Sequence, residues 1–169
     1  SESQLRLIVL NGANGQIDWQ IPLALVKHDL QLHPARRLRQ LPLLWHDGWL
    51  ICPTGSGCIV TIDTVSRNYE WAYRYTNRDA VPRQPGRFAS DDQVRFVPHA
   101  GWQRIGLASD LHRVYLASPE TESIQALDIK TGQLVWEQPR QDGIYLGGLV
   151  GDKLIVVGYR SLRGLDPLT

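Results

Sequence analysis

Cysteine is the first side chain in this sequence whose chemistry and spacing suggest a specific structure. Cys52 and Cys58 bracket residues 53–57, which read as a turn between two strands. This spacing could place the two thiols opposite each other across a hairpin, within reach of a disulfide. The alternative is two small, packed hydrophobic residues. Without a nearby histidine or further cysteine, the pair cannot complete a tetrahedral zinc site, so no metal centre is predicted here.

Serine and histidine are the other candidates for catalysis. Ser56 stands between two glycines, but the segment lacks the Lys-Ser/Thr of a phosphate-binding loop and the Gly-x-Ser-x-Gly frame of a hydrolase. We therefore interpret it as a hairpin turn. The histidines show no ligand spacing on one element, and each lies in or beside an expected loop: His28, His33, His46, His99 and His112. No catalytic residue and no metal ligand is predicted.

Arginine offers a candidate binding surface. Residues 27–40 form a basic connector, and residues 77–99 form a polar, proline-rich insertion of a length that is usually functional or mobile. The candidate partner surface within the insertion consists of Arg78, Arg83, Arg87 and Arg95. It would suit an acidic protein surface or a polysaccharide. The alternative is a solvated loop, because Asp79, Asp91 and Asp92 dilute the charge.

Composition excludes several classes of protein. The chain has 169 residues, of which 43% are hydrophobic and 21% charged, as in a soluble globular domain. A formal net charge of +1, with no basic stripe or stacking platform, argues against nucleic-acid binding. No apolar run approaches the roughly 20 residues of a membrane span. The polar start without Met leads us to expect that the chain begins inside a longer protein or after processing.

The sequence contains an internal repeat, which would form the strands and turns that position the residues named above. Segments 10–19, 62–71 and 127–136 align without gaps: an aliphatic residue, Asp or Asn, a polar turn, and a Trp nine positions after the aliphatic residue. A fourth start at 165–169 is cut off before its Trp. Each unit reads as a hairpin, in which the Asp side chain bonds back to turn amides and Thr131-Gly132 supplies the bend. Two alternating strands precede the second and the third hairpin, so the repeat is a four-stranded unit.

Four antiparallel strands repeated along a chain predict the blades of a β-propeller. We expect an all-β fold and a single propeller segment of about two full and two partial blades. The blade parts cover residues 5–22, 41–75, 101–140 and 144–166, with the insertion at 77–99 between blades. A closed ring takes about four to eight blades, so we expect a piece of a larger propeller with open blade edges that could self-associate.

The third repeat resembles the tryptophan-docking motif of quinoprotein-type (PQQ-like) propellers. It has the motif residues Ala126, Asp128, Thr131, Gly132 and Trp136 at the family's offsets. The second repeat keeps Asp63 and Trp71 but has Arg67 in place of glycine. The first keeps Gly15 and Trp19 with Asn11 for Asp, and the truncated fourth keeps Asp166. The resemblance implies that Trp19, Trp71 and Trp136 each pack on the next blade.

Enzymes of the quinoprotein family bind pyrroloquinoline quinone (PQQ) and Ca²⁺ at the ring centre, often beside a disulfide of adjacent cysteines. This sequence has no adjacent cysteines and no acidic cluster suited to a hard cation; Asp91 and Asp92 lie in the insertion. We therefore expect this chain to bind no cofactor by itself. PQQ and Ca²⁺ would bind only if the rest of the ring carries the site. Non-enzymatic relatives use the repeat as a scaffold, including an outer-membrane assembly lipoprotein of Gram-negative bacteria.

The function expected from these features is a non-catalytic interaction scaffold or binding module. It would be part of a larger extracytoplasmic protein, in the periplasm or on the cell surface, with a protein or a glycan as its partner. One alternative is a fragment of a PQQ- and Ca²⁺-dependent dehydrogenase. Another is a glycan- or ligand-sensing propeller, which predicts an exposed aromatic residue such as Trp49 or Trp102 beside a polar groove.

Overall fold

The computed structural model describes residues 3–26, 41–75, 105–118 and 121–168. Within these ranges every regular element is a β-strand. The basic connector 27–40 and the insertion 77–99, with the candidate partner surface of Arg78, Arg83, Arg87 and Arg95, lie outside the described residues, as does Trp102.

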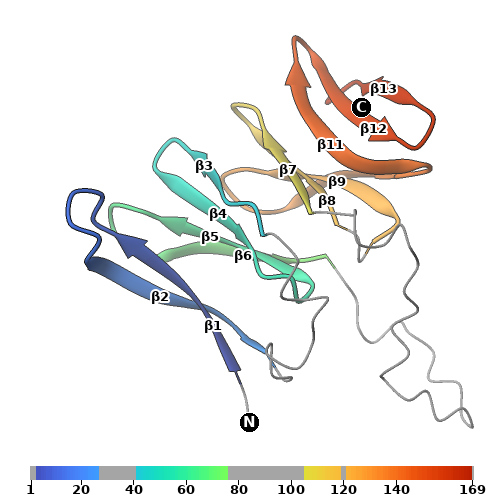
Figure 1. Cartoon of the computed structure of the whole chain (residues 1–169). Coiled ribbons are helices and arrows are strands. Elements are labelled where there is room, and N and C mark those ends of the chain that lie inside the picture. Colours follow the sequence, from blue (N-terminus) through green and yellow to red (C-terminus); the bar gives the residue numbers. More distant parts are fainter. Residues whose placement is uncertain (1–2, 27–40, 76–104, 119–120, 169) are drawn as a thin grey trace, which may run out of the picture.

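The strands form four antiparallel sheets that follow one another in chain order (Figure 1). The first sheet pairs β1 (Ser3–Leu10) with β2 (Ile17–Val26). The second contains β3 (Leu44–His46), β4 (Trp49–Pro53), β5 (Cys58–Asp63) and β6 (Tyr69–Arg74). The third contains β7 (Gly106–Ser109), β8 (Arg113–Ala117), β9 (Ser123–Asp128) and β10 (Leu134–Pro139). The fourth contains β11 (Gly143–Val150), β12 (Lys153–Gly158) and β13 (Leu162–Leu165).

Each sheet pairs its strands in sequence order, as a propeller blade does. The sheets are arranged as a fan, with neighbouring sheets face to face (Figure 1). The predicted fold class, a propeller segment with two complete and two partial blades, is confirmed.

The connections alternate between two ends of the fan because antiparallel strands reverse direction at each turn. The turns after β1, β3, β5, β7, β9 and β11 gather at one end, at the upper left of Figure 1. We call this end the turn face.

The core consists of three apolar layers, one between each pair of neighbouring sheets. The layer between the first and second sheets includes Leu7, Cys52, Val60 and Ile62, with Trp19 packed against them. The layer between the second and third is built on residues of β4, β5, β8 and β9, and the layer between the third and fourth on residues of β8, β9 and β12. Central strands therefore bury both faces, because successive side chains of a strand point to opposite sides.

The cysteine pair shows how strand register decides side-chain contacts. Cys52 is paired with Val60, and Cys58 with Arg74, so the two cysteines are not direct cross-strand partners. Diagonal neighbours in a sheet lie about 7–8 Å apart, too far for ordinary disulfide geometry. Both thiols are free. The disulfide considered from the spacing is not formed, and Cys52 instead packs as a fully buried hydrophobic residue.

Candidate interaction surface

The turn after β9 is held by the aspartate of the docking motif. Asp128 Oδ1 accepts hydrogen bonds from the amide of Lys130 (3.0 Å), the amide of Thr131 (2.8 Å) and the hydroxyl of Thr131 (2.9 Å). The Gly132 amide donates to the Asp128 carbonyl oxygen at 2.8 Å. The bonds to Thr131 and Lys130 lower the pKa of Asp128. The carboxylate therefore stays ionised and fixes the turn.

The corresponding turns of the first two sheets use the same construction. Asp63 Oδ1 accepts from the amides of Val65 and Ser66, at 2.7 and 2.8 Å. In the first sheet, Asn11 Oδ1 accepts from the amide of Ala13 at 2.9 Å. All three turns also place a residue in the left-handed region at the same repeat position: Gly15 (φ 72°), Arg67 (φ 60°) and Gly132 (φ 69°).

Two of the three repeat tryptophans bond directly to the next sheet. Trp71 Nε1 donates to the carbonyl oxygen of Ile129 at 2.9 Å, and Trp136 Nε1 donates to that of Pro167 at 2.9 Å. Each acceptor is the residue that follows the turn aspartate of the next repeat. Trp136 also lies beside Tyr115, with ring centroids 5.9 Å apart. These contacts link each blade to its successor at the turn face.

The first interface is built differently, because Arg67 stands where the third repeat has glycine. Its guanidinium carbon lies 5.9 Å from the centre of the Trp19 ring, a cation–π arrangement. Arg67 Nη2 also lies 3.9 Å from Asp18 Oδ2. Trp19 therefore meets a cation on the second sheet.

A further carboxylate organises the turn between β7 and β8. Asp110 Oδ1 accepts from the amides of His112 and Arg113, both at 2.7 Å, and Oδ2 accepts from the buried Tyr115 hydroxyl at 2.5 Å. Burial opposes ionisation of Asp110, but these bonds outweigh it and lower its pKa. Burial, together with the bond to Asp110, raises the pKa of Tyr115 to about 12. The tyrosine therefore acts as a neutral donor and not as a base.

The rigid turns carry large apolar side chains that point to solvent. Polar residues and glycine usually occupy tight turns, so apolar residues repeated there are informative. Val65 and Leu111 are 87% and 78% exposed, and Trp45 is 65% exposed. Among the described residues, exposed apolar side chains at or beside turn-face connections occur in all four sheets: Leu10, Ile17, Trp45, Val65, Leu111, Leu134, Val150 and Leu168.

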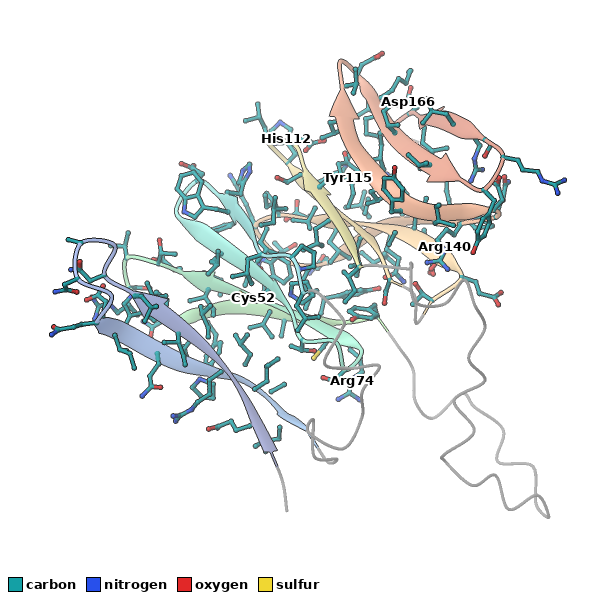
Figure 2. All side chains as sticks on the ribbon, in the orientation of Figure 1. Cys52, Arg74, His112, Tyr115, Arg140 and Asp166 are labelled. Carbon is teal, nitrogen blue, oxygen red and sulfur yellow. The ribbon has the colours of Figure 1, made fainter. Side chains whose placement is uncertain are left out.

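Carboxylates are interleaved with these apolar residues. The lowered pKa values of Asp63, Asp110, Asp128 and Asp166 keep them ionised. The turn face also carries cations: Arg67 lies near Asp18, and Lys153 lies 3.4 Å from Asp166. Figure 2 shows His112 and Asp166 toward this end and Arg74 and Arg140 toward the opposite end. The turn face thus combines apolar and acidic groups on fixed turns.

The remaining candidates for chemistry are dispersed. His46 Nδ1 lies 3.4 Å from Ser109 Oγ, a contact between the second and third sheets. Cys58 Sγ lies 3.1 Å from the Thr54 hydroxyl, in the turn that also contains Ser56. Trp49 is half-buried and packs against the layer between the second and third sheets, so it offers no open aromatic platform.

The described residues were also compared with the requirements of a metal site. Among these residues, no three His, Cys, Asp or Glu side chains come together as metal ligands. An open depression of about 410 Å³ lies at the end opposite the turn face, lined by residues 121–123 and 137–139. Its acidic groups are Glu122 and Glu137, and Glu137 accepts a hydrogen bond from Gln125 at 3.1 Å. This donor set is too small for the several oxygen ligands of Ca²⁺.

The structure places the motif residues as follows. Ala126 is fully buried in the layer between the third and fourth sheets. Asp166 Oδ1 accepts from the Leu168 amide at 2.9 Å, as the other turn aspartates accept from theirs. The exposed apolar residues of the turn face were missed by the sequence analysis. A signal existed in Asp-Thr-Val-Ser at residues 63–66 and Ser-Asp-Leu-His at residues 109–112, where an apolar residue interrupts a polar turn.

The sheet order and the tryptophan contacts between sheets define a β-propeller segment. Its fold is similar to that of BamB from Moraxella catarrhalis, with 23% identity, a TM-score of 0.56, and coverage of 95% of this chain and 43% of that one. This chain therefore spans less than half of the length of BamB. Among the described residues, no helix is long and apolar enough to cross a membrane.

Two dehydrogenases match this chain at lower TM-scores. Quinohemoprotein alcohol dehydrogenase from Comamonas testosteroni has 21% identity and a TM-score of 0.46, over 75% of this chain and 18% of the enzyme. A europium-containing methanol dehydrogenase has 15% identity and a TM-score of 0.49, over 82% and 22%. No family model matches the sequence, and no curated protein matches it either.

Proposed function

We propose that this chain is a non-catalytic interaction scaffold, part of a larger extracytoplasmic protein, whose turn face binds a partner protein. The observation that carries the proposal is the set of exposed apolar side chains on the turns of all four sheets. Because aspartate bonds hold the turns that carry Val65 and Leu111, these side chains are presented with little loss of entropy on binding. The partner surface would combine apolar anchors with basic groups, complementary to the turn aspartates.

A photo-crosslinking experiment in the native host tests this proposal. A photoreactive amino acid is placed at position 65 or 111 on the turn face. The matched control is position 162, where Leu162 is 72% exposed but lies at the end opposite the turn face. We expect one discrete protein adduct from the turn-face positions and none from the control. Adducts of equal yield from all three positions, or from none, would contradict a partner site on the turn face.

Point substitutions distinguish a specific binding site from non-specific association of exposed apolar side chains. With the crosslinker at position 65, Leu111→Ser should abolish the adduct, whereas Leu162→Ser should leave it unchanged, since both leucines are exposed but only Leu111 lies on the turn face. The dehydrogenase alternative is tested by titrating the protein with PQQ and Ca²⁺ while recording tryptophan fluorescence. Saturable, Ca²⁺-dependent quenching would favour the enzyme, and a flat response is expected for the scaffold.

A further inference from the structure

Three interfaces join the four sheets, and the first differs from the second in the residue that receives the tryptophan. At the second interface, a Cβ added to Gly132 would lie 2.4 Å from Cε3 of Trp71, so the ring rests directly on the turn backbone. Arg67 occupies the same repeat position and the same left-handed conformation, but it has a Cβ. The Trp19 ring therefore cannot pack directly on the turn backbone at Arg67 in the way that the Trp71 ring packs on Gly132.

At the first interface, solvent-exposed charge contacts take the place of this packing on glycine. The guanidinium of Arg67 lies beside the Trp19 ring and 3.9 Å from Asp18. The side chains of Arg67 and Asp18 are each 53% exposed. Charge contacts at this exposure are weak and are screened by salt, whereas a tryptophan seated on glycine has no charge to screen.

We infer that the docking of the first sheet, β1–β2, on the second sheet depends on ionic strength through Arg67. The other contacts of the first sheet with the second sheet are the apolar layer around Leu7 and a hydrogen bond from the Tyr69 hydroxyl to the Pro22 carbonyl oxygen. When this interface opens, β1–β2 loses the packing that protects its amides, and the apolar face of the second sheet is uncovered.

The reactivity of the Cys52 thiol can be used to measure the opening of this interface. Cys52 is fully buried in the layer between the first and second sheets, and burial raises the pKa of its thiol to about 12. Cys58 is partly exposed in the same chain and serves as an internal reference. The rate at which Cys52 reacts with N-ethylmaleimide, divided by the rate for Cys58, therefore measures opening of the first interface.

The experiment compares this ratio at about 0.01 M and about 1 M NaCl, where the screening length falls from about 30 Å to about 3 Å. We expect the ratio to rise about twofold to fivefold in the wild type, the size expected for exposed charge contacts. Arg67→Gly restores the glycine of the other repeats and should make the ratio independent of salt. Lys130→Ala, which removes a cation from the equivalent turn of the third sheet, should keep the wild-type salt response.

Hydrogen exchange gives a second readout of the same event. Amides of β1 and β2 should exchange faster at high salt, while those of β9 and β10 keep their rates. A salt-independent cysteine ratio in the wild type would overturn the inference. So would an equal salt response in Arg67→Gly, or an equal acceleration of exchange in β9 and β10, because each would assign the effect to the whole fold.

Discussion

Gly132 and Trp71 lie so close together that the turn of the third sheet has no room for a side chain. A Cβ at Gly132 would lie 2.4 Å from Cε3 and 2.5 Å from Cδ2 of the indole. The indole nitrogen bonds to the Ile129 carbonyl oxygen in the same turn, so the ring cannot shift without breaking that bond. Backbone, glycine and tryptophan therefore form one packed unit between two blades.

Gly132→Ala should destabilise the fold through this contact. The matched control is Gly151→Ala, because Gly151 has a similar left-handed φ of 59° but nothing within 4 Å of an added Cβ. Both variants carry the backbone cost of about 1–2 kcal/mol for a non-glycine residue in this conformation. Gly132→Ala should lose about a further 1–3 kcal/mol from overpacking, measured by urea unfolding. An equal loss of unfolding free energy in the two variants would show that the Trp71 indole moves aside without a measurable cost.

Trp71→Ala should cost about 3–5 kcal/mol in the free energy of unfolding, because it removes a packed indole between two sheets. Trp71→Phe, which keeps an aromatic ring but no donor for Ile129, should lie between Trp71→Ala and the wild type. The control is Trp45→Ala, whose exposed ring should change stability by no more than about 0.5 kcal/mol. If Trp45→Ala were as damaging as Trp71→Ala, the docking role assigned to Trp71 would not hold.

Asp128 should make stability depend on acid. The amide and hydroxyl of Thr131 hold its pKa below the ordinary value in the folded chain. Its stabilising effect is therefore complete above the unfolded pKa of about 3.9 and is lost as the pH falls through the lower folded value. Asp128→Ala should lose about 1–2 kcal/mol near neutral pH.

Asp128→Asn tests the charge separately from the hydrogen bonds. The first repeat already uses Asn11 at this position, and its side-chain oxygen accepts from the Ala13 amide. The asparagine variant should keep most of the stability near neutral pH and show a smaller loss in acid than the wild type. Urea unfolding between about pH 2 and pH 7 provides the measurement. An acid dependence as steep as that of the wild type would assign the titration to other carboxylates.

Tyr115 should make stability depend on alkali. Burial, then the hydrogen bond to Asp110, raises its pKa to about 12 in the folded chain. The contribution is fully present below the unfolded pKa of about 10 and is lost as the pH rises toward the folded value. Tyr115→Phe should be less stable at neutral pH by about 1.5–3 kcal/mol, through loss of a bond to a carboxylate, and should lose less on moving to about pH 11.

The exposed Tyr145 supplies the comparison for Tyr115. Tyr145→Phe removes an exposed hydroxyl and should leave the free energy of unfolding at neutral pH within about 0.5 kcal/mol of the wild type. Cys52 remains in both variants, and burial also raises its thiol pKa to about 12, so a residual alkaline loss is expected in each. If the Tyr115 and Tyr145 variants behaved alike in alkali, Tyr115 would not be the titrating group.

Much of the fold was readable from the sequence because its determinants are local. The turn aspartates bond to amides two and three residues onward, and the left-handed residue follows within the same turn. Three such hairpins each carry a Trp, and alternating strands precede the second and the third, so the pattern already implied blades. A resemblance at five positions of the third repeat, from Ala126 to Trp136, then suggested the type of propeller. These features can be recognised in the sequence without knowing which sheets pack against each other.

The candidate site was less predictable, since it depends on side chains far apart in the sequence. Cys52 and Cys58 were considered as a disulfide, yet the register of β4 on β5 pairs Cys52 with Val60. Val65 and Leu111 each interrupt a polar turn in the sequence, but they belong to one surface only because the fan places alternate turns at the same end. The arginines chosen as a partner surface lie outside the described residues.

The sequence by itself determined the repeated hairpin and hence the blade, because each hairpin is specified by bonds and conformations within about ten residues. Tertiary structure alone decided what each blade meets. Arg67 looked like a defect of the docking motif, but packing places it beside Trp19, 48 positions away along the chain, and near Asp18. Contacts between blades depend on register and sheet packing, and neither is encoded in the local pattern of a single repeat.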